Sequence, residues 1–266
     1  MPLCTIDVAD SIATLTLTHP TMPPSIFGEI EGAMGEIAAR EGVRVVLIRS
    51  QAKVFSYGLD LPAAMNDLGP HLAGAQTAGP RMELLALIRR LQGAFNAVAG
   101  CRVPVVSAIH GFCVGGGLDL AAACDIRLCS AETRFSLRET KIAMVADLGS
   151  LQRLPAIIGP GHTKELAFTG KDITAARAKE IGLVNEVFPD PEALFAGARA
   201  LCAEIAANSP LAVQGVKQVL RYGEGKSVAE GLEYVAAWNA AFLASEDLGE
   251  AMAAFMQKRP PSFKGR

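Results

Sequence analysis

Three consecutive glycines and a nearby carboxylate form the part of this chain with the clearest capacity for chemistry. Gly115, Gly116 and Gly117 carry no Cβ, so the backbone there can approach a ligand closely. These glycines lead into a predicted helix, and the free N–H groups and dipole at a helix N-terminus favour negative charge. Asp119 follows one turn further along. The stretch therefore indicates a place for an anion, or for an oxyanion that develops during a reaction.

Two familiar kinds of anion site do not match this stretch. A phosphate-binding loop requires Lys and then Ser or Thr after its last glycine, whereas Gly117 and Leu118 follow Gly116. A dinucleotide-binding fingerprint that begins at Gly115 requires Gly or Ala at the position of Leu120. A helix that packs closely on a strand through its glycines is an alternative that this stretch alone leaves open.

The elements around the glycines predict how they are held in place. The apolar run Val105–Ile109 is too short for a helix and rich in β-branched residues, so it is predicted as a buried strand. A glycine-dense turn over 111–117 then leads into a short helix over Leu118–Cys124 and a second strand over Asp125–Cys129. This order of strand, helix and strand is typical of an α/β domain with parallel pairing.

The rest of the chain extends this α/β pattern and then changes character. Residues 61–80 contain glycines and prolines without clear periodicity and are predicted as a mobile connection, suited to act as a lid. Residues 132–154 are expected to be irregular. Residues 191–266 are expected to form a helical region beyond an α/β core over 1–190. The other predicted elements are a hairpin (Cys4–Val8, Ile12–Thr18), strands at Val43–Ile48 and Leu183–Phe188, and helices at Ile26–Arg40, Met82–Val98, His162–Phe168, Thr174–Ile181 and Glu192–Ala207.

Composition excludes several classes of protein. The chain has 266 residues, half of them hydrophobic, and a net charge of -2, which suits one sizeable core and gives no footprint for nucleic acid. No apolar run is long enough to span a membrane, and neither end carries a recognisable targeting signal, so a cytoplasmic protein is predicted. The six cysteines lack metal-ligand spacing and are expected to be buried thiols, with no metal site.

Two motifs carry a resemblance to a known family. The segments FSYGLD at 55–60 and HGFCVGGGLDLAAACDIRLC at 110–129 resemble the crotonase (enoyl-CoA hydratase/isomerase) superfamily, and the similarity continues over nearly the whole chain. The segments GGGLDLAAACDIR, VADLGSLQRLP and SVAEGLEYVAAWN are most similar to dienoyl-CoA isomerases. The resemblance implies an α/β spiral of repeated ββα units, with a helical C-terminal region that joins subunits into trimers or hexamers.

The resemblance also implies how a coenzyme A thioester would bind. Its carbonyl oxygen would accept hydrogen bonds from the backbone N–H groups of Tyr57 and Gly116, which would stabilise the negative charge that develops there. Tyr57 is bulkier than the small residue usual at this position, so its ring is expected to reshape the acyl pocket. The other residues implied at the substrate-binding motifs are Ser56, Gly58, Asp60 and Gly115, with Asp60 in a structural role.

Three carboxylates match those of dienoyl-CoA isomerases. By resemblance, Asp147 removes a proton from C2 of a 3,5-dienoyl-CoA, and Glu139 supplies one at C6 to give the 2,4-dienoyl-CoA of fatty-acid β-oxidation. Asp119 would keep Glu139 protonated or oriented, since an apolar pocket can push such pKa values apart. No cofactor is implied. Without the resemblance, Asp119 suits the first turn of a helix, Glu139 a solvated face and Asp147 a turn or N-cap.

Three other functions remain open at this point. An enoyl-CoA hydratase would add water to a 2-enoyl-CoA with two glutamates at the positions of Asp119 and Glu139, and it usually has glycine at the position of Asp147. An aroyl-CoA dehalogenase would use Asp147 as a nucleophile, with Trp in place of Glu139. A non-catalytic acyl-CoA-binding protein would follow if Tyr57 blocked the site. The shorter Asp119 and the additional Asp147 favour the isomerase.

Overall fold

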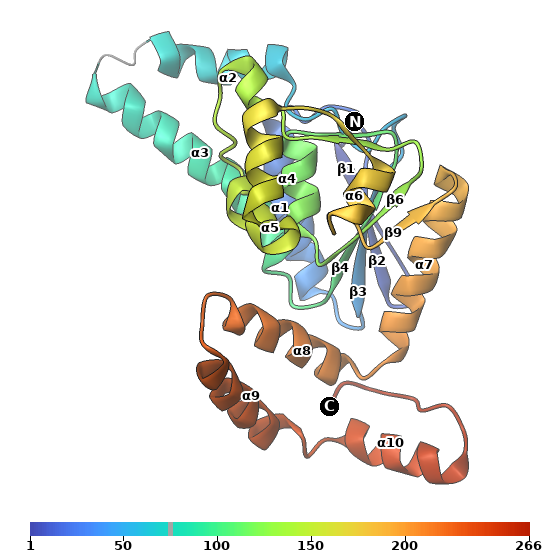
Figure 1. The fold of residues 1–266 in the computed structure, drawn as a ribbon. Helices are drawn as coiled ribbons and strands as arrows, with labels where there is room; N and C mark the ends of the chain where they lie inside the picture. The colour runs from blue at the N-terminus through green and yellow to red at the C-terminus, as the bar shows by residue number, and fades with distance from the viewer. Residues whose placement is uncertain (74–76) are drawn as a thin grey trace.

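A six-stranded sheet organises the protein, for which the computed structural model describes residues 1–73 and 77–266 (Figure 1). The hairpin at one edge is antiparallel, and every other neighbouring pair in this sheet is parallel. The predicted α/β class with parallel pairing is therefore confirmed. In spatial order the strands are β1 (Cys4–Ala9), β2 (Ile12–Leu17), β3 (Val45–Ser50), β4 (Val105–Ile109), β6 (Ile126–Ser130) and β9 (Glu186–Phe188).

Neighbouring residues of the central strands face opposite layers of helices. Val105 belongs to the larger apolar core, which includes residues of α1 (Ser25–Ala39) and α3 (Ala78–Ala99). Val106 belongs to a second core, on the other face of the sheet, against α7 (Pro191–Ala207). All five residues of β4 are buried, as expected for a parallel strand that is covered on both faces.

A second, three-stranded sheet holds the segments that carry the predicted site. β5 (Phe112–Val114) pairs in parallel with β7 (Arg134–Ser136), which pairs antiparallel with β8 (Ile173–Thr174). The sequence had indicated only a turn over 111–117 and irregular chain over 132–154. These strands are two or three residues long and pair with distant parts of the chain, so no local periodicity marks them.

The prediction of an irregular connection over 61–80 is wrong for its described part. α2 (Leu61–Ala73) is a helix in spite of Pro70, and α3 already begins at Ala78; residues 74–76 lie outside the described residues. The Asp60 side chain accepts a hydrogen bond from Ala63 N at 3.0 Å and so satisfies a free donor at the start of α2. This contact with Asp60 stabilises the helix although the local sequence pattern of α2 is weak.

The C-terminal helices lie beyond the sheet, as Figure 1 shows. The predicted succession of helices is confirmed. α7 buries Leu194, Ala198 and Cys202 against the sheet, and the division of the chain at residue 190 stays a prediction. The remaining helices of the chain are α4 (Gly116–Ala123), α5 (Ser150–Thr169), α6 (Ala175–Glu180), α8 (Pro210–Gly223), α9 (Val228–Phe242), α10 (Glu246–Gln257) and the short 3-10 helix η1 (Glu139–Ile142).

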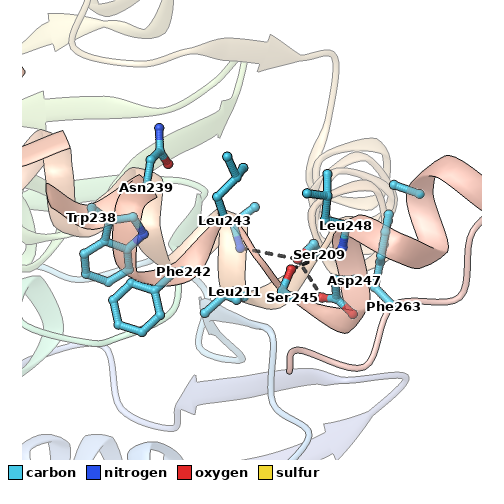
Figure 2. Close-up of a pocket in the computed structure, with 12 residues that line it drawn as sticks. Ser209, Leu211, Trp238, Asn239, Phe242, Leu243, Ser245, Asp247, Leu248 and Phe263 are labelled. Carbon is cyan, nitrogen blue, oxygen red and sulfur yellow. Dashed lines mark hydrogen bonds between the residues drawn. The ribbon is translucent and has the colours of Figure 1, made fainter. Parts of the chain in front are cut away.

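A small hollow separates the ends of the last three helices. Figure 2 shows its mainly apolar lining, which includes Trp238, Phe242 and Phe263 and encloses about 230 Å³. At its rim Ser209 Oγ donates a hydrogen bond of 2.6 Å to Asp247. None of the three predicted catalytic acids lines this hollow, so it is a feature of the C-terminal helices and not the predicted site.

Three further predictions concern the cysteines, membrane-spanning helices and metal sites. All six cysteines are buried and unpaired, which confirms the prediction of buried thiols. Within residues 1–73 and 77–266, no helix is both long and apolar enough to cross a membrane. No group of His, Cys, Asp and Glu side chains in the same ranges is arranged to hold a metal ion.

Candidate active site

Two glycine-bearing segments make direct backbone contact at the start of α4. Ser56 pairs with the β5 segment, since Ser56 N donates to Phe112 O at 2.9 Å and Val114 N donates to Ser56 O at 3.0 Å. A Cβ at Gly58 would lie 2.7 Å from Val114 O, and one at Gly117 would lie 2.8 Å from Ser56 Cβ. Glycine is therefore required at both positions, and its absence of a side chain brings the 56–59 segment against the N-terminus of α4.

Tyr57 does not provide the free backbone donor that the sequence predicted. Its N–H donates a hydrogen bond of 2.7 Å to Pro20 O. An uninterrupted parallel ladder would use Gly58 for this bond, but the positive φ of Gly58, 87°, interrupts the ladder and shifts the pairing by one residue. The Tyr57 prediction is corrected for this reason: the register against the segment around Pro20 is a tertiary feature.

Leu59, and not Tyr57, has the free backbone N–H beside Gly116. Met22 N donates to Gly58 O at 2.8 Å, and Asp60 N donates to Met22 O at 3.0 Å, so Leu59 between them directs its own N–H away from Met22. Leu59 N lies 3.9 Å from the point where a Cβ of Gly116 would stand. Across the described chain neither Leu59 N–H nor Gly116 N–H has a hydrogen-bond partner, the second because it begins a helix.

Glu139 occupies the space beside these donors. Gly115 has a φ of 52°, and a Cβ there would lie 2.9 Å from Glu139 Oε1. The other carboxylate oxygen, Oε2, is buried without a hydrogen-bond partner. Burial raises the pKa of Glu139 to about 7, and the negative charges of Asp119 and Asp147 add to this rise. Glu139 can therefore hold a proton near neutral pH and release it to a partner.

Asp119 is a buried carboxylate fixed by the N-terminus of another helix. Its side chain is 1% exposed, and its Oδ1 accepts hydrogen bonds from Ser150 N and Ser150 Oγ, both at 2.6 Å. Burial raises its pKa to about 6, while the two Ser150 donors oppose the rise because they stabilise the ionised form. The dipole of α5 acts in the same direction as these donors.

Asp147 joins the two other acids from the irregular segment before α5. Burial raises its pKa, and its own backbone N–H opposes this rise. Its negative charge also raises the pKa of both Asp119 and Glu139, which places the three carboxylates within electrostatic reach of one another. The structure therefore brings together the three acids that the sequence singled out.

Ser56 and Asp60 serve to build the turn. Ser56 is 1% exposed, and its Oγ accepts a hydrogen bond from Gly58 N at 3.0 Å. Asp60 accepts hydrogen bonds from Thr21 Oγ1 at 2.9 Å and from Ala63 N. Both side chains are thus engaged in hydrogen bonds within the turn, and their binding of substrate stays a prediction.

Sequence reasoning missed three residues at this site: Leu59, Ser150 and Gln92. Gln92 Nε2 donates a hydrogen bond of 2.7 Å to Asp147 O. The partners of Ser150 and Gln92 are 31 and 55 residues away, so no local pattern could reveal either contact. Leu59 lies within the predicted motif, but only the register of the Met22 segment distinguishes its N–H from that of Tyr57.

Comparison with known proteins identifies the family. The family model Enoyl-CoA hydratase/isomerase matches residues 7–266. The chain belongs to this family. The predicted superfamily and the prediction that the protein is an enzyme are both confirmed.

Individual relatives and solved structures agree with this assignment. A mitochondrial Delta(3,5)-Delta(2,4)-dienoyl-CoA isomerase of Dictyostelium discoideum is 40% identical over 95% of this chain and 87% of its own. A peroxisomal protein of the same name from Arabidopsis thaliana is 41% identical, over 89% and 85%. The crystal structure of an enoyl-CoA hydratase from Bacillus anthracis superposes with a TM-score of 0.89 at 28% identity and covers 99% of this chain and 100% of its own. The predicted crotonase-like fold is confirmed.

Ionisation of Glu139 is expected to destabilise the folded protein. Folding raises its pKa from 4.5 to about 7, so between these values the folded state binds more protons than the unfolded chain, and the free energy of unfolding falls as pH rises. Glu139→Gln removes this loss. In urea unfolding, its stability relative to wild type should increase from about pH 5 to about pH 8. A difference that stays constant over this range would contradict the raised pKa.

Proposed function

We propose that the protein is an isomerase that converts a 3,5-dienoyl-CoA into the conjugated 2,4-dienoyl-CoA in fatty-acid β-oxidation. The observation that carries the proposal is that Glu139 lies beside two unpaired backbone N–H groups and is influenced electrostatically by Asp119 and Asp147. The relatives named dienoyl-CoA isomerase, at about 40% identity over most of the chain, support the same reaction.

The proposed oxyanion site consists of Leu59 N–H and Gly116 N–H. A thioester carbonyl between them would accept two hydrogen bonds, and loss of a proton beside the carbonyl would move negative charge onto its oxygen. Donors that are already in place stabilise this charge without reorganisation, and one such donor typically contributes about 10²–10³ in rate. The N-terminus of α4, which Gly116 begins, adds a favourable dipole.

Proton transfer is assigned to two of the three acids. Asp147 takes a proton from C2, the electrons of that bond shift through the two double bonds, and Glu139 delivers a proton to C6. The double bonds then stand at C2 and C4. Each turnover leaves Asp147 protonated and Glu139 ionised, and proton exchange with solvent restores the starting state. Because only protons move, the reaction needs neither a metal ion nor a redox cofactor.

Asp119 is assigned an indirect part in this reaction. Its two hydrogen bonds from Ser150 favour the ionised form, and its negative charge raises the pKa of Glu139. An ionised Asp119 therefore favours the protonated form of Glu139, which is the form that the reaction requires. The division of roles follows from environment, since burial acts on all three acids and only Asp119 receives two donors from a helix start.

Assembly and location complete the proposal. Large apolar side chains of the C-terminal helices are exposed in the single chain, and we propose that they join subunits into a trimer or a hexamer. A cytoplasmic location stays a prediction from the sequence, whereas the relatives are named mitochondrial or peroxisomal. The exposed side chains of this surface are Val216, Leu220, Val228, Leu232, Met252, Phe255 and Met256.

The first test compares two substrates by ultraviolet absorbance. With a 3,5-dienoyl-CoA, we expect absorbance of the conjugated 2,4-diene to grow, because the proposed base removes the C2 proton and the proposed acid supplies a proton at C6. With a 2-enoyl-CoA, we expect little change. Loss of enoyl absorbance without diene formation would identify a hydratase, the activity that the solved structures at 28% identity carry in their names. Binding of both esters without reaction would favour a non-catalytic acyl-CoA-binding protein.

The second test removes the proposed base. Asp147→Asn keeps the side-chain volume but cannot accept the C2 proton, so isomerisation should fall by about 10²–10⁴. Binding of a saturated acyl-CoA, measured by calorimetry, should stay within a few-fold of wild type, because the proposed thioester donors are backbone groups. Isomerisation at the wild-type rate would show that Asp147 is not the base.

The third test distinguishes Leu59 from Tyr57 as the backbone donor. Replacement of Leu59 by the corresponding α-hydroxy acid turns its amide N–H into an ester oxygen and leaves the side chain intact. We expect kcat to fall by about 10²–10³. The same replacement at Tyr57 is the matched control, and it should mainly lower stability, since that N–H is bound to Pro20 O. The reverse order of effects on kcat would restore Tyr57 as the donor.

A further inference from the structure

Helix α3 holds the segment that carries Asp147 at two points. Gln92 Nε2 donates a hydrogen bond of 2.7 Å to the backbone carbonyl of Asp147. One helical turn later, Asn96 Oδ1 accepts a hydrogen bond of 2.8 Å from Arg153 Nη2, and Arg153 Nη1 donates to Leu148 O at 3.3 Å. The two contacts together hold both sides of the turn that leads from Asp147 into α5.

This segment has little structure of its own. Residues 143–148 belong to no helix or strand, and Met144 and Val145 are 36% and 72% exposed. Gly149 has a φ of 124°, so the chain turns sharply before α5 begins. Among the described residues, no backbone N–H bonds to the Asp147 carbonyl. Among the described residues, the hydrogen-bond donor to the Asp147 carbonyl is the side chain of Gln92.

The anchor for this contact is rigid. Around Gln92, α3 buries Ala94, Phe95 and Val98 in the main core. The rings of Phe95 in α3 and Phe27 in α1 lie 5.3 Å apart and pack the two helices together. The hydrogen bond from Gln92 thus holds an otherwise irregular segment against a packed helix.

We propose that Gln92 is a positioning residue for Asp147, which fixes the backbone of the base so that its carboxylate meets C2 of the substrate. This inference rests on the proposed function, because it needs Asp147 to be the base. An amide suits the task because it donates to the carbonyl without adding charge beside three carboxylates. Gln92 touches no reacting atom in this scheme and acts only through Asp147. Proton transfer is sensitive to such geometry, since a displacement of about 1 Å can cost about 10² in rate.

The test replaces Gln92 by methionine, which has similar volume but no donor. In Gln92→Met we expect kcat for the 3,5-dienoyl-CoA to fall by about tenfold or more. KM and the affinity for a saturated acyl-CoA should stay within about twofold, because the proposed thioester donors do not involve α3. The matched control is Arg89→Met, which alters an exposed residue on the same helix and should leave both constants unchanged.

A second variant and the wild type distinguish failure of the Gln92 proposal from failure of the proposed function. Gln92→Asn keeps a neutral amide but is one methylene shorter, so its donor should not reach the Asp147 carbonyl, and it decides the question if Gln92→Met does not fold. An unchanged kcat in a folded variant would overturn the role of Gln92, and so would a rise in KM without a fall in kcat. Absence of isomerisation in the wild type would instead overturn the proposed function itself.

Discussion

The site depends on one close contact, between the backbone of the 56–59 segment and the backbone that leads into α4. Gly58 and Gly117 allow it, because a Cβ at either position would lie within 3 Å of an atom of the other segment. The contact interrupts the ladder to Pro20 and Met22, turns Leu59 N–H away from that ladder, and leaves it beside Gly116 N–H. Without glycine at these points the two segments could not approach each other this closely.

Hydrogen bonds that act on a shared burial give the three carboxylates their different properties. Removal from water raises the pKa of Asp119, Glu139 and Asp147 alike, and mutual repulsion adds to the rise for Asp119 and Glu139. The two acids differ in their hydrogen bonds. Asp119 accepts them from Ser150, whereas Glu139 keeps one carboxylate oxygen without a partner. This difference in hydrogen bonding arises because the N-terminus of α5 points toward Asp119. Carboxyl groups of nearly the same type therefore acquire different surroundings, and the pKa of Asp119 is raised to about 6 while that of Glu139 is raised to about 7.

Most of the fold could be predicted because its elements are long or strongly patterned. The buried run Val105–Ile109 and the helical periodicity of Met82–Val98 both correspond to observed elements, β4 and α3. The strands β5, β7 and β8 could not be predicted, since each has two or three residues and is stable only through its partners. α2 escaped prediction for a related reason: its first turn depends on Asp60, which is held in place by Thr21.

The sequence by itself determined the family, the three acids and the need for glycine, because these are matters of residue type and local spacing. Tertiary structure decided which backbone N–H groups are free. Tyr57 and Leu59 are two residues apart in one motif, and only the register against Pro20 and Met22 consumes the first donor and frees the second. Tertiary structure also decided what supports each acid, since Ser150 and Gln92 reach partners 31 and 55 residues away. Hydrogen bonds of this kind depend on distances between packed elements, which local spacing does not contain.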